Sequence, residues 1–477
     1  MISTPPAQTD SAVQIKPAAT WVLLSLSMAM LLSSLGTSIT NVALPTLAQV
    51  FGVSFQAVQW VVLAYLLAIT SLIVGAGRLG DMLGRRRLLL AGIGLFTVAS
   101  VLCAAAPTLW LLIAARAVQG LGAAILMALT MALVGEAVPK EKTGSAMGLL
   151  GTMSAVGTAL GPTLGGVLIG SGGWQAIFWV NVPLGVLTFF LARRYLPMDR
   201  SGPKPAWASF DGPGTLLLAL TLVAYALAMT LGRGSFGWLN AALLLATATG
   251  AGVFVWVEKR AAAPLIRWAM FSNSVLSAGF AMSALVTTVV MATLVVGPFY
   301  LSGALQLEAA HVGLVMSTGP LVAALAGVPA GRLVDRLGAD RVSNGGLFAM
   351  VAGCAALALL PTRFSVPGYV VPLVVVTAGY ALFQAANNTA VMRDVPADKR
   401  GVVSGLLGLS RNLGLITGAS VMGAVFVAGS AASGIASTGP ESVAAGMRAT
   451  LAVAASLVAV ALVIAAGSRA SAKAQQL

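Results

Sequence analysis

The sequence predicts an all-helical polytopic membrane protein with fourteen transmembrane helices, built as two related six-helix bundles with two helices inserted between them. Three observations support this: repeated apolar runs, basic residues in alternate loops, and an internal sequence repeat. Of the 477 residues, 58% are hydrophobic and 8% are charged, whereas a soluble domain carries about 25% charged residues. Apolar runs of about 20 residues can each cross a bilayer core as a helix, because lipid offers no partners for the backbone.

The apolar runs divide the chain into fourteen expected spans. The first run, 18–45, is too long for the core of a signal peptide and is expected to remain as span 1. The expected spans are 18–45, 58–76, 88–106, 109–134, 145–169, 176–192, 214–232, 241–257, 275–301, 312–330, 342–360, 369–391, 402–427 and 448–466.

These spans group into five expected regions, and the two tails are expected to be short. The regions are a tail at 1–17, a six-helix bundle at 18–194, a linker with the two extra helices at 195–270, a second six-helix bundle at 271–467, and a tail at 468–477.

Basic residues are distributed unequally between the two sets of loops. The net charge is +14, and with the N-terminus inside, 22 of the 27 lysines and arginines fall in cytoplasmic segments and three in outer ones. This bias follows the positive-inside rule and places both termini in the cytoplasm. It also accounts for the charge without a nucleic-acid partner. We therefore expect a multi-pass protein of a bacterial-type inner (plasma) membrane.

Two sequence blocks occur twice in the chain at nearly the same offset. The segment 77–87 (GRLGDMLGRRR) is identical to 331–341 (GRLVDRLGADR) at seven of eleven positions, and glycines and neighbouring residues of 138–161 recur in 395–418. The first pair is eight spans apart, so both copies lie on one side of the membrane. Parallel repeats of this kind occur in transporters whose substrate site lies between the halves.

These motifs resemble those of the major facilitator superfamily over most of the chain. The segment 77–86 is similar to the family's loop between its second and third spans, and 116–122 (RAVQGLG) to its span 4 motif. The segment 157–166 (GTALGPTLGG) resembles the antiporter motif of span 5, and with two inserted spans it points to the fourteen-span drug:proton antiporters. The resemblance implies the superfamily fold and secondary active efflux by alternating access, coupled to protons.

The chain departs from this subfamily at one position in span 1. Gly36 stands where the subfamily usually has an acidic residue, in the stretch Leu35-Gly36-Thr37. No carboxylate lies in the middle of any expected span, which is unusual for a proton-coupled exchanger of cations. Substrates are therefore expected to be neutral or anionic, since the two charges within spans are Arg116 and Arg411.

Charged residues and glycines are the candidates for gating. Asp81 sits at a helix end beside two arginines, where it can pair across the two halves, and glycines every four residues in span 5 allow close helix approach. The alternatives are a solvated turn for Asp81 and ordinary packing for the glycines. The candidate gating residues are Asp81, Arg85, Arg86, Gly157, Gly161, Pro162, Gly165, Asp335 and Arg336.

Arg116 is the leading candidate for a functional residue within the membrane. A charge in a span is costly and tends to face a cavity, although a structural arginine bonded to backbone carbonyls is the alternative. For Arg411 a functional and a structural role are equally compatible with the sequence. The candidate substrate contacts are Asn41, Trp60, Tyr65, Arg116, Gln119, Phe280, Tyr300, Phe383, Gln384 and Asn388.

Several classes of function are disfavoured. Cys103 and Cys354 lie in apolar runs, no Walker phosphate loop is present, and Gly120-x-Gly122 lies inside a span. We expect a monomer without cofactor, metal or enzymatic activity, whose partners are the lipid bilayer, a small molecule and the proton. The alternative on the same fold is an uptake symporter or an uncoupled facilitator of an organic anion.

Overall fold

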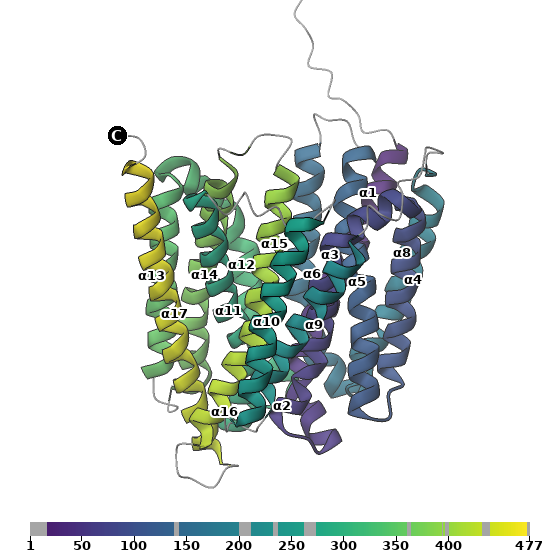
Figure 1. The fold of residues 1–477 in the computed structure, drawn as a ribbon. Helices are drawn as coiled ribbons and strands as arrows, with labels where there is room; N and C mark the ends of the chain where they lie inside the picture. Colours follow the sequence, from purple (N-terminus) through teal and green to yellow (C-terminus); the bar gives the residue numbers. More distant parts are fainter. Residues whose placement is uncertain are drawn as a thin grey trace, which may run out of the picture.

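The chain folds into a bundle of long, roughly parallel and antiparallel helices (Figure 1). The computed structural model describes residues 17–137, 143–199, 211–231, 237–261, 273–359, 364–393, 395, 400–431 and 439–474, and these contain helices and turns but no strand. Within these ranges, fourteen helical segments are long and apolar enough to cross a membrane. The prediction of an all-helical protein with fourteen spans is confirmed.

The spans follow one another along the chain in two halves, with the inserted helices between them. The N-terminal half contains α1 (Pro17–Phe51), α2 (Phe55–Val58), α3 (Trp60–Leu83), α4 (Arg85–Ala104), α5 (Leu109–Ala137), α6 (Thr143–Gly172), α7 (Ala176–Trp179) and α8 (Asn181–Tyr195). The inserted helices are α9 (Gly212–Thr230) and α10 (Trp238–Arg260). The C-terminal half contains α11 (Ser274–Phe299), η4 (Tyr300–Ala304), α12 (Ala309–Leu337), α13 (Ala339–Leu359), α14 (Ser365–Met392), α15 (Arg400–Thr417), η6 (Gly418–Met422), α16 (Gly423–Ala431) and α17 (Pro440–Ala474).

Four spans that the sequence predicts as continuous helices are interrupted or irregular. Span 2 breaks at Gln59 and span 6 at Val180, while span 9 ends in the π-helical turn η4 and span 13 contains the π-helical turn η6. A π turn adds a residue to the helix and rotates the residues beyond it, and such turns are common at functional sites. Apolar periodicity does not reveal these local changes, because the residues remain apolar through them.

The motif expected as a loop after span 2 is mostly helical. Helix α3 continues through Asp81 to Leu83, and the turn itself is a single residue, Gly84, with φ of +96°. Its counterpart Gly338 has φ of +83°. Both values lie in the left-handed region, which glycine adopts without a steric penalty. The two repeated segments therefore form the same tight helix–glycine–helix turn.

The sequence repeat has a counterpart in helix packing. A Cβ built on Gly157 of α6 would lie 2.7 Å from the carbonyl oxygen of Leu31 in α1. A Cβ on the repeat-related Gly414 of α15 would run into the carbonyl oxygen of Ala284 in α11. In each half, the fifth span therefore packs directly on the backbone of the first span at an equivalent glycine: α6 on α1, and α15 on α11.

The two halves touch at one end of the bundle and separate toward the other. We call these the Phe55 end and the Asp81 end; the Asp81 end, where α1 begins and α17 ends, is at the top in Figure 1. A Cβ on Gly166 of α6 would lie 2.8 Å from the Ala309 carbonyl oxygen and 2.9 Å from the Gly313 Cα in α12.

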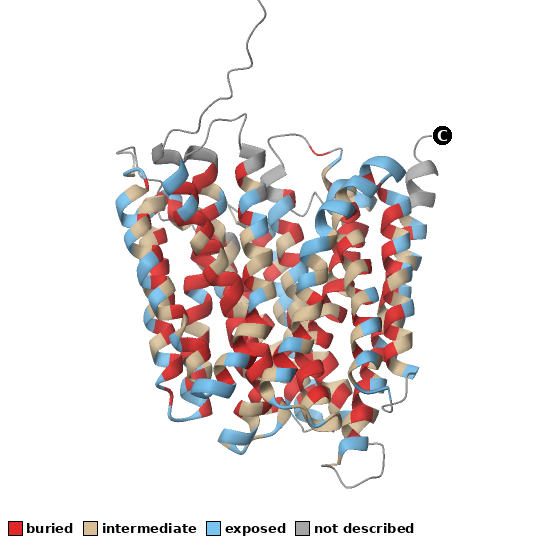
Figure 2. Cartoon of the chain, turned by 180° about the vertical axis from the view of Figure 1, so that it is seen from behind, coloured by how far each residue is buried: buried red, intermediate tan, exposed pale blue. Residues whose placement is uncertain are grey.

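Farther along α12, this contact is lost. Gly331 lies 18 residues beyond Gly313, which is five turns along the same helix face, yet a Cβ there would meet no atom within 4 Å. Figure 2 shows many intermediate and exposed residues on the central helices toward the Asp81 end, at its top. Helix α12 is therefore packed on α6 at the Phe55 end, whereas Gly331 faces open space toward the Asp81 end.

The inserted helices lie in front of the seam between α3 and α15 (Figure 1). Trp60 Nε1 of α3 donates to Thr230 Oγ1 of α9 at 3.0 Å, and the hydroxyls of Tyr225 in α9 and Thr417 in α15 are 3.1 Å apart. Asn240 of α10 donates to the carbonyl oxygen at 228, which fastens α10 to α9. Helix α9 consequently contacts both halves.

We predict that Gly157→Val lowers the stability of the fold whereas Gly151→Val does not. The added methyl groups at Gly157 would meet the backbone of α1, which cannot yield as a flexible side chain would, and overpacking costs about 1–3 kcal/mol. A Cβ at Gly151, on the same helix, meets nothing within 4 Å. Thermal unfolding of the two purified variants in detergent measures the difference. Equal melting temperatures would show that the α1–α6 contact is not tight.

Candidate functional site

A buried arginine organises the interior of the N-terminal half. The Arg116 side chain is 1% exposed. It donates through Nε to the carbonyl oxygen of Val61 in α3 at 3.0 Å and through Nη1 to the carbonyl oxygen of Gly36 in α1 at 3.1 Å. Nη1 also donates to Gln119 Oε1 at 2.6 Å. One side chain therefore ties α5 to α1 and α3.

Aromatic and polar groups complete the surroundings of this guanidinium. Its central carbon lies 4.0 Å from the centre of the Tyr65 ring, a cation–π arrangement. Gln119 Nε2 donates to Ser100 Oγ of α4 at 2.7 Å. Arg116 Nη2 has no hydrogen-bond partner among the residues that the structure describes. No carboxylate contacts the guanidinium there, so the charge is balanced only by carbonyl, amide and ring dipoles.

The packing around Gly36 explains how α1 does without an acidic side chain. A Cβ at this position would lie 2.8 Å from Cζ of Phe96 and 3.3 Å from the Tyr65 hydroxyl. The Phe96 ring thus occupies the space that a side chain at position 36 would need. The Gly36 carbonyl oxygen, rather than a carboxylate, receives the Arg116 N–H.

The other predicted substrate contacts do not gather into one site in this conformation. Asn41 is 1% exposed and its side-chain oxygen has no partner among the described residues. Trp60 bonds to the inserted helix α9, and Tyr300 stacks on Tyr369 with ring centres 5.8 Å apart. On the C-terminal half, Phe280 and Phe383 are buried, Gln384 is half-buried and Asn388 is exposed.

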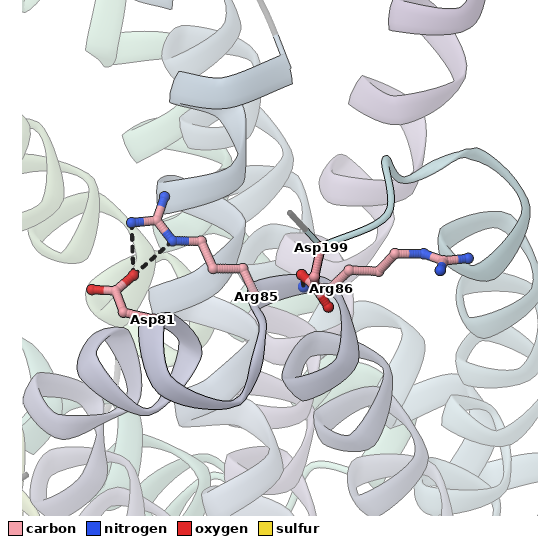
Figure 3. Close-up of polar contacts among 4 residues, drawn as sticks. All are labelled: Asp81, Arg85, Arg86 and Asp199. Carbon is pink, nitrogen blue, oxygen red and sulfur yellow. Dashed lines mark hydrogen bonds and ion pairs between the residues drawn. The ribbon is translucent and has the colours of Figure 1, made fainter. Parts of the chain in front are cut away.

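The predicted gating acid at the Asp81 end is paired within its own half. Asp81 Oδ1 and Arg85 Nη2 lie 2.8 Å apart across the Gly84 turn (Figure 3). This exposed pair contributes about 0–1 kcal/mol, so it can exchange partners easily. The repeat-related Asp335 and Arg336 are exposed and form no ion pair with any residue in the described ranges.

Asp199 is a structural partner of this turn that sequence reasoning missed. Its carboxylate accepts the backbone N–H of Arg86 at 2.8 Å and of Arg87 at 3.2 Å, so it caps the N-terminus of α4 (Figure 3). The Arg86 side chain donates to the Arg193 carbonyl oxygen. The segment after α8 therefore anchors the start of α4. No local pattern signals a cap supplied by a residue more than 100 positions away.

An aromatic cluster joins the two halves at the Phe55 end. The Phe55 ring of α2 lies 4.7 Å from Phe299 of α11 and 5.1 Å from Phe426 of α16, centre to centre. Rings at these distances attract one another beyond the burial of their area. We call these three residues the aromatic gate. Its position between halves was not predicted, because the three phenylalanines come from separate spans.

Gln59 lies beside the aromatic gate and is the second residue that sequence reasoning missed. It is fully buried at the break between α2 and α3 and contacts Gly423 of α16. Neither polar atom of its side chain has a partner in the described part of the chain, and a buried unsatisfied group costs about 1–3 kcal/mol. Opening this end would let water reach the amide. The signal was present in the sequence as a glutamine at the start of an apolar run, three residues after Gln56.

The glycine motif of α6 packs against two neighbouring helices, α1 and α12. The predicted gating glycines at 161 and 165 pack on α1: a Cβ at 161 would overlap Ser38, and a Cβ at 165 would lie 3.1 Å from Ile39. The Pro162 carbonyl oxygen faces α12, 2.5 Å from where a Cβ of Gly313 would lie. The close helix approach expected for this motif is observed on both sides.

Residues 26–419 match the family described as the Major Facilitator Superfamily. The chain is 31% identical over 408 residues to the riboflavin transporter RibZ of Clostridioides difficile, covering 85% of this chain and 88% of that one. It is 32% identical over 410 residues to the multidrug resistance protein Stp of Mycobacterium tuberculosis, covering 85% and 75%. A bacterial homolog of the human lysosomal transporter Spinster, solved inward-facing and occupied, has the same fold, with a TM-score of 0.71, 15% identity and coverage of 96% and 98%.

We predict that Arg116→Met preserves the fold but reduces transport at least tenfold. The carbonyl groups that Arg116 contacts lie within helices, where they also accept backbone hydrogen bonds, so they keep a partner when Arg116 is replaced. Replacing a buried charge with an apolar group of similar volume is also often neutral for stability. Transport of a fluorescent dye by proteoliposomes, together with thermal unfolding, measures both effects.

Leu112→Met is the matched control, since Leu112 is a buried residue one turn away on the same helix and the exchange conserves volume. Normal transport by Arg116→Met would contradict a functional role. A loss of transport that only parallels unfolding would indicate a structural role.

Proposed function

Because this chain belongs to the major facilitator superfamily, we propose that it is a secondary active exporter of small amphipathic molecules that exchanges them for protons by alternating access. The observation that carries the proposal is the difference between the two ends of α12, which packs on α6 at Gly313 and faces open space at Gly331. A transporter that alternates must hold one end closed while the other is open.

The export direction is supported by the span 5 motif, and the substrate class is supported by the relatives. The glycines and Pro162 of α6, which resemble the antiporter motif in sequence, are in backbone contact with α1 and α12. Two relatives bear the names riboflavin transporter and multidrug resistance protein. Both names refer to small molecules, so we propose small molecules as the substrate class of this chain.

The distribution of lysines and arginines supports a cytoplasmic location for the Asp81 end and for both termini. With that orientation, the structure is open to the cytoplasm and closed to the outside. A substrate would enter from the cytoplasm or the inner leaflet. Release would require separation of the aromatic gate, exposure of the Gln59 amide and closure of the Asp81 end.

The charges within the membrane favour neutral or anionic substrates. In the described residues, no carboxylate lies in the middle of a span, whereas Arg116, Arg411 and Arg448 each lie seven or eight residues inside one. A multiply cationic substrate would meet only like charge in this region. A substrate without positive charge avoids that repulsion.

One observation favours a second candidate, an uptake symporter or uncoupled facilitator of an organic anion. Gly36 replaces the acid that carries protons in the subfamily that the chain resembles, and Phe96 fills the space beside it. Without a proton-binding carboxylate in the spans, transport would follow the substrate gradient alone. A pH gradient separates the two candidates.

Proteoliposomes with an acidic lumen are expected to accumulate the neutral dye N-phenyl-1-naphthylamine (NPN). In an antiporter the protons leave as the dye enters, so a gradient of one pH unit supports about a tenfold concentration ratio if one proton is exchanged per molecule. NPN fluorescence measures the accumulation, and protein-free liposomes and an ionophore that collapses the gradient are controls. Equal NPN levels with and without the gradient would contradict proton exchange and favour the facilitator.

A further inference from the structure

Arg411 lies on α15, away from the Arg116 cluster, by which we mean Arg116 with Tyr65 and Gln119. Arg411 is exposed, and its side chain makes no hydrogen bond or ion pair with any residue in the described ranges. It lies eight residues inside the apolar span Val403–Ala431, about 12 Å along the helix. A charge at that depth is costly in lipid and is tolerated where it faces a water-filled space.

The residues around Arg411 indicate which way this face points. Ser404, Gly408, Arg411 and Leu415 are spaced at i, i+4, i+7 and i+11 and share one face of the helix. None of the four is fully buried, whereas Ser410, on the adjacent face, donates its hydroxyl to a backbone carbonyl of α11. A lipid-facing stripe would be apolar, so this stripe faces the space between the halves.

Open space adjoins the guanidinium. A Cβ built on Gly405 or Gly408 would meet no atom within 4 Å, although both residues lie within two turns of Arg411. The repeat-related face of α6 shares this property at Gly151, the counterpart of Gly408 at an offset of 257. The corresponding residue to Arg411 is Ser154, which bonds to Ser34 of α1 at 2.7 Å. The two halves are therefore both open at the equivalent glycines 151 and 408, but the position of Arg411 is taken in the N-terminal half by an uncharged serine that packs on α1.

A latch to the opposite half is a weaker explanation for Arg411. Among the described acids of the N-terminal half, Asp199 caps α4 and Asp81 lies two residues from the end of α3. Arg411 lies eleven residues into α15, about 16 Å along the helix axis from its start. An acid at the end of the bundle would not reach that depth when the halves close.

We infer that Arg411 binds the anionic group of the substrate, so that the site between the halves selects amphipathic molecules with one negative charge. This inference rests on the proposed function. A guanidinium offers a fork of N–H donors that matches a carboxylate, sulfonate or phosphate. The Arg116 cluster, enclosed in the N-terminal half, is not the contact for this group.

Two dyes that differ by one sulfonate test this assignment. The dye 8-anilino-1-naphthalenesulfonate (ANS) has the aromatic skeleton of NPN plus one negative charge. Arg411→Gln is expected to lower the ratio of ANS to NPN transport in proteoliposomes by about tenfold or more, the size of one charge-assisted contact. Arg411→Lys should recover part of the ratio. Arg341→Gln is the matched control, an exposed arginine on α13 that should leave the ratio unchanged.

Each outcome bears on a different claim. An equal loss of both dyes in Arg411→Gln would overturn the inference and indicate a structural role or a contact with lipid phosphate. Wild-type transport of NPN without ANS would overturn the inference and leave the proposed function standing. Wild-type transport of neither dye would contradict the proposed function and the inference with it.

Thiol labelling tests the placement of this face independently of any substrate. The native cysteines at 103 and 354 are buried, so the background is low. Arg411→Cys should react with a membrane-impermeant maleimide, and the neighbouring Ser410→Cys should not. Equal reactivity of the two variants would overturn the proposed exposure of Arg411.

Discussion

The structure depends on the two glycine-lined faces of α6. One face packs on α1 at positions 157, 161 and 165, and the other on α12 at 162 and 166. Contacts of this kind join backbone to backbone, so they fix the register of three helices without long side chains between them. The internal packing of the N-terminal half and its closure on the C-terminal half are consequently set by one helix.

The register of α1 in turn determines the chemistry of the N-terminal half. With α1 held against α6, the Gly36 carbonyl faces Arg116 and the Phe96 ring closes the adjacent space. A positive charge is thus enclosed with no acid in contact among the described residues, and the cation–π contact and hydrogen bonds are what balance it. Arg411 adds a second positive charge, in the open space rather than the interior.

Much of the architecture follows from the sequence because it depends on local composition. Apolar run length specifies the spans, and the repeated glycines at 157 and 414 mark equivalent helix contacts. The interrupted helices were not predictable, since Gln59 and η6 lie in apolar surroundings that look continuous. The cap that Asp199 provides and the hydrogen bond from Tyr225 to Thr417 join residues far apart in sequence. Such contacts depend on how helices pack, which periodicity does not encode.

The central claim is that the two ends of the α6–α12 seam open in alternation, and distances between spin labels test it most directly. One pair at Ser171 and His311 reports on the Phe55 end, and one at Leu149 and Arg332 reports on the Asp81 end; all four side chains are exposed. On addition of substrate and a pH gradient, the first distance should lengthen as the second shortens. Distances that change in the same direction, or not at all, would contradict the account.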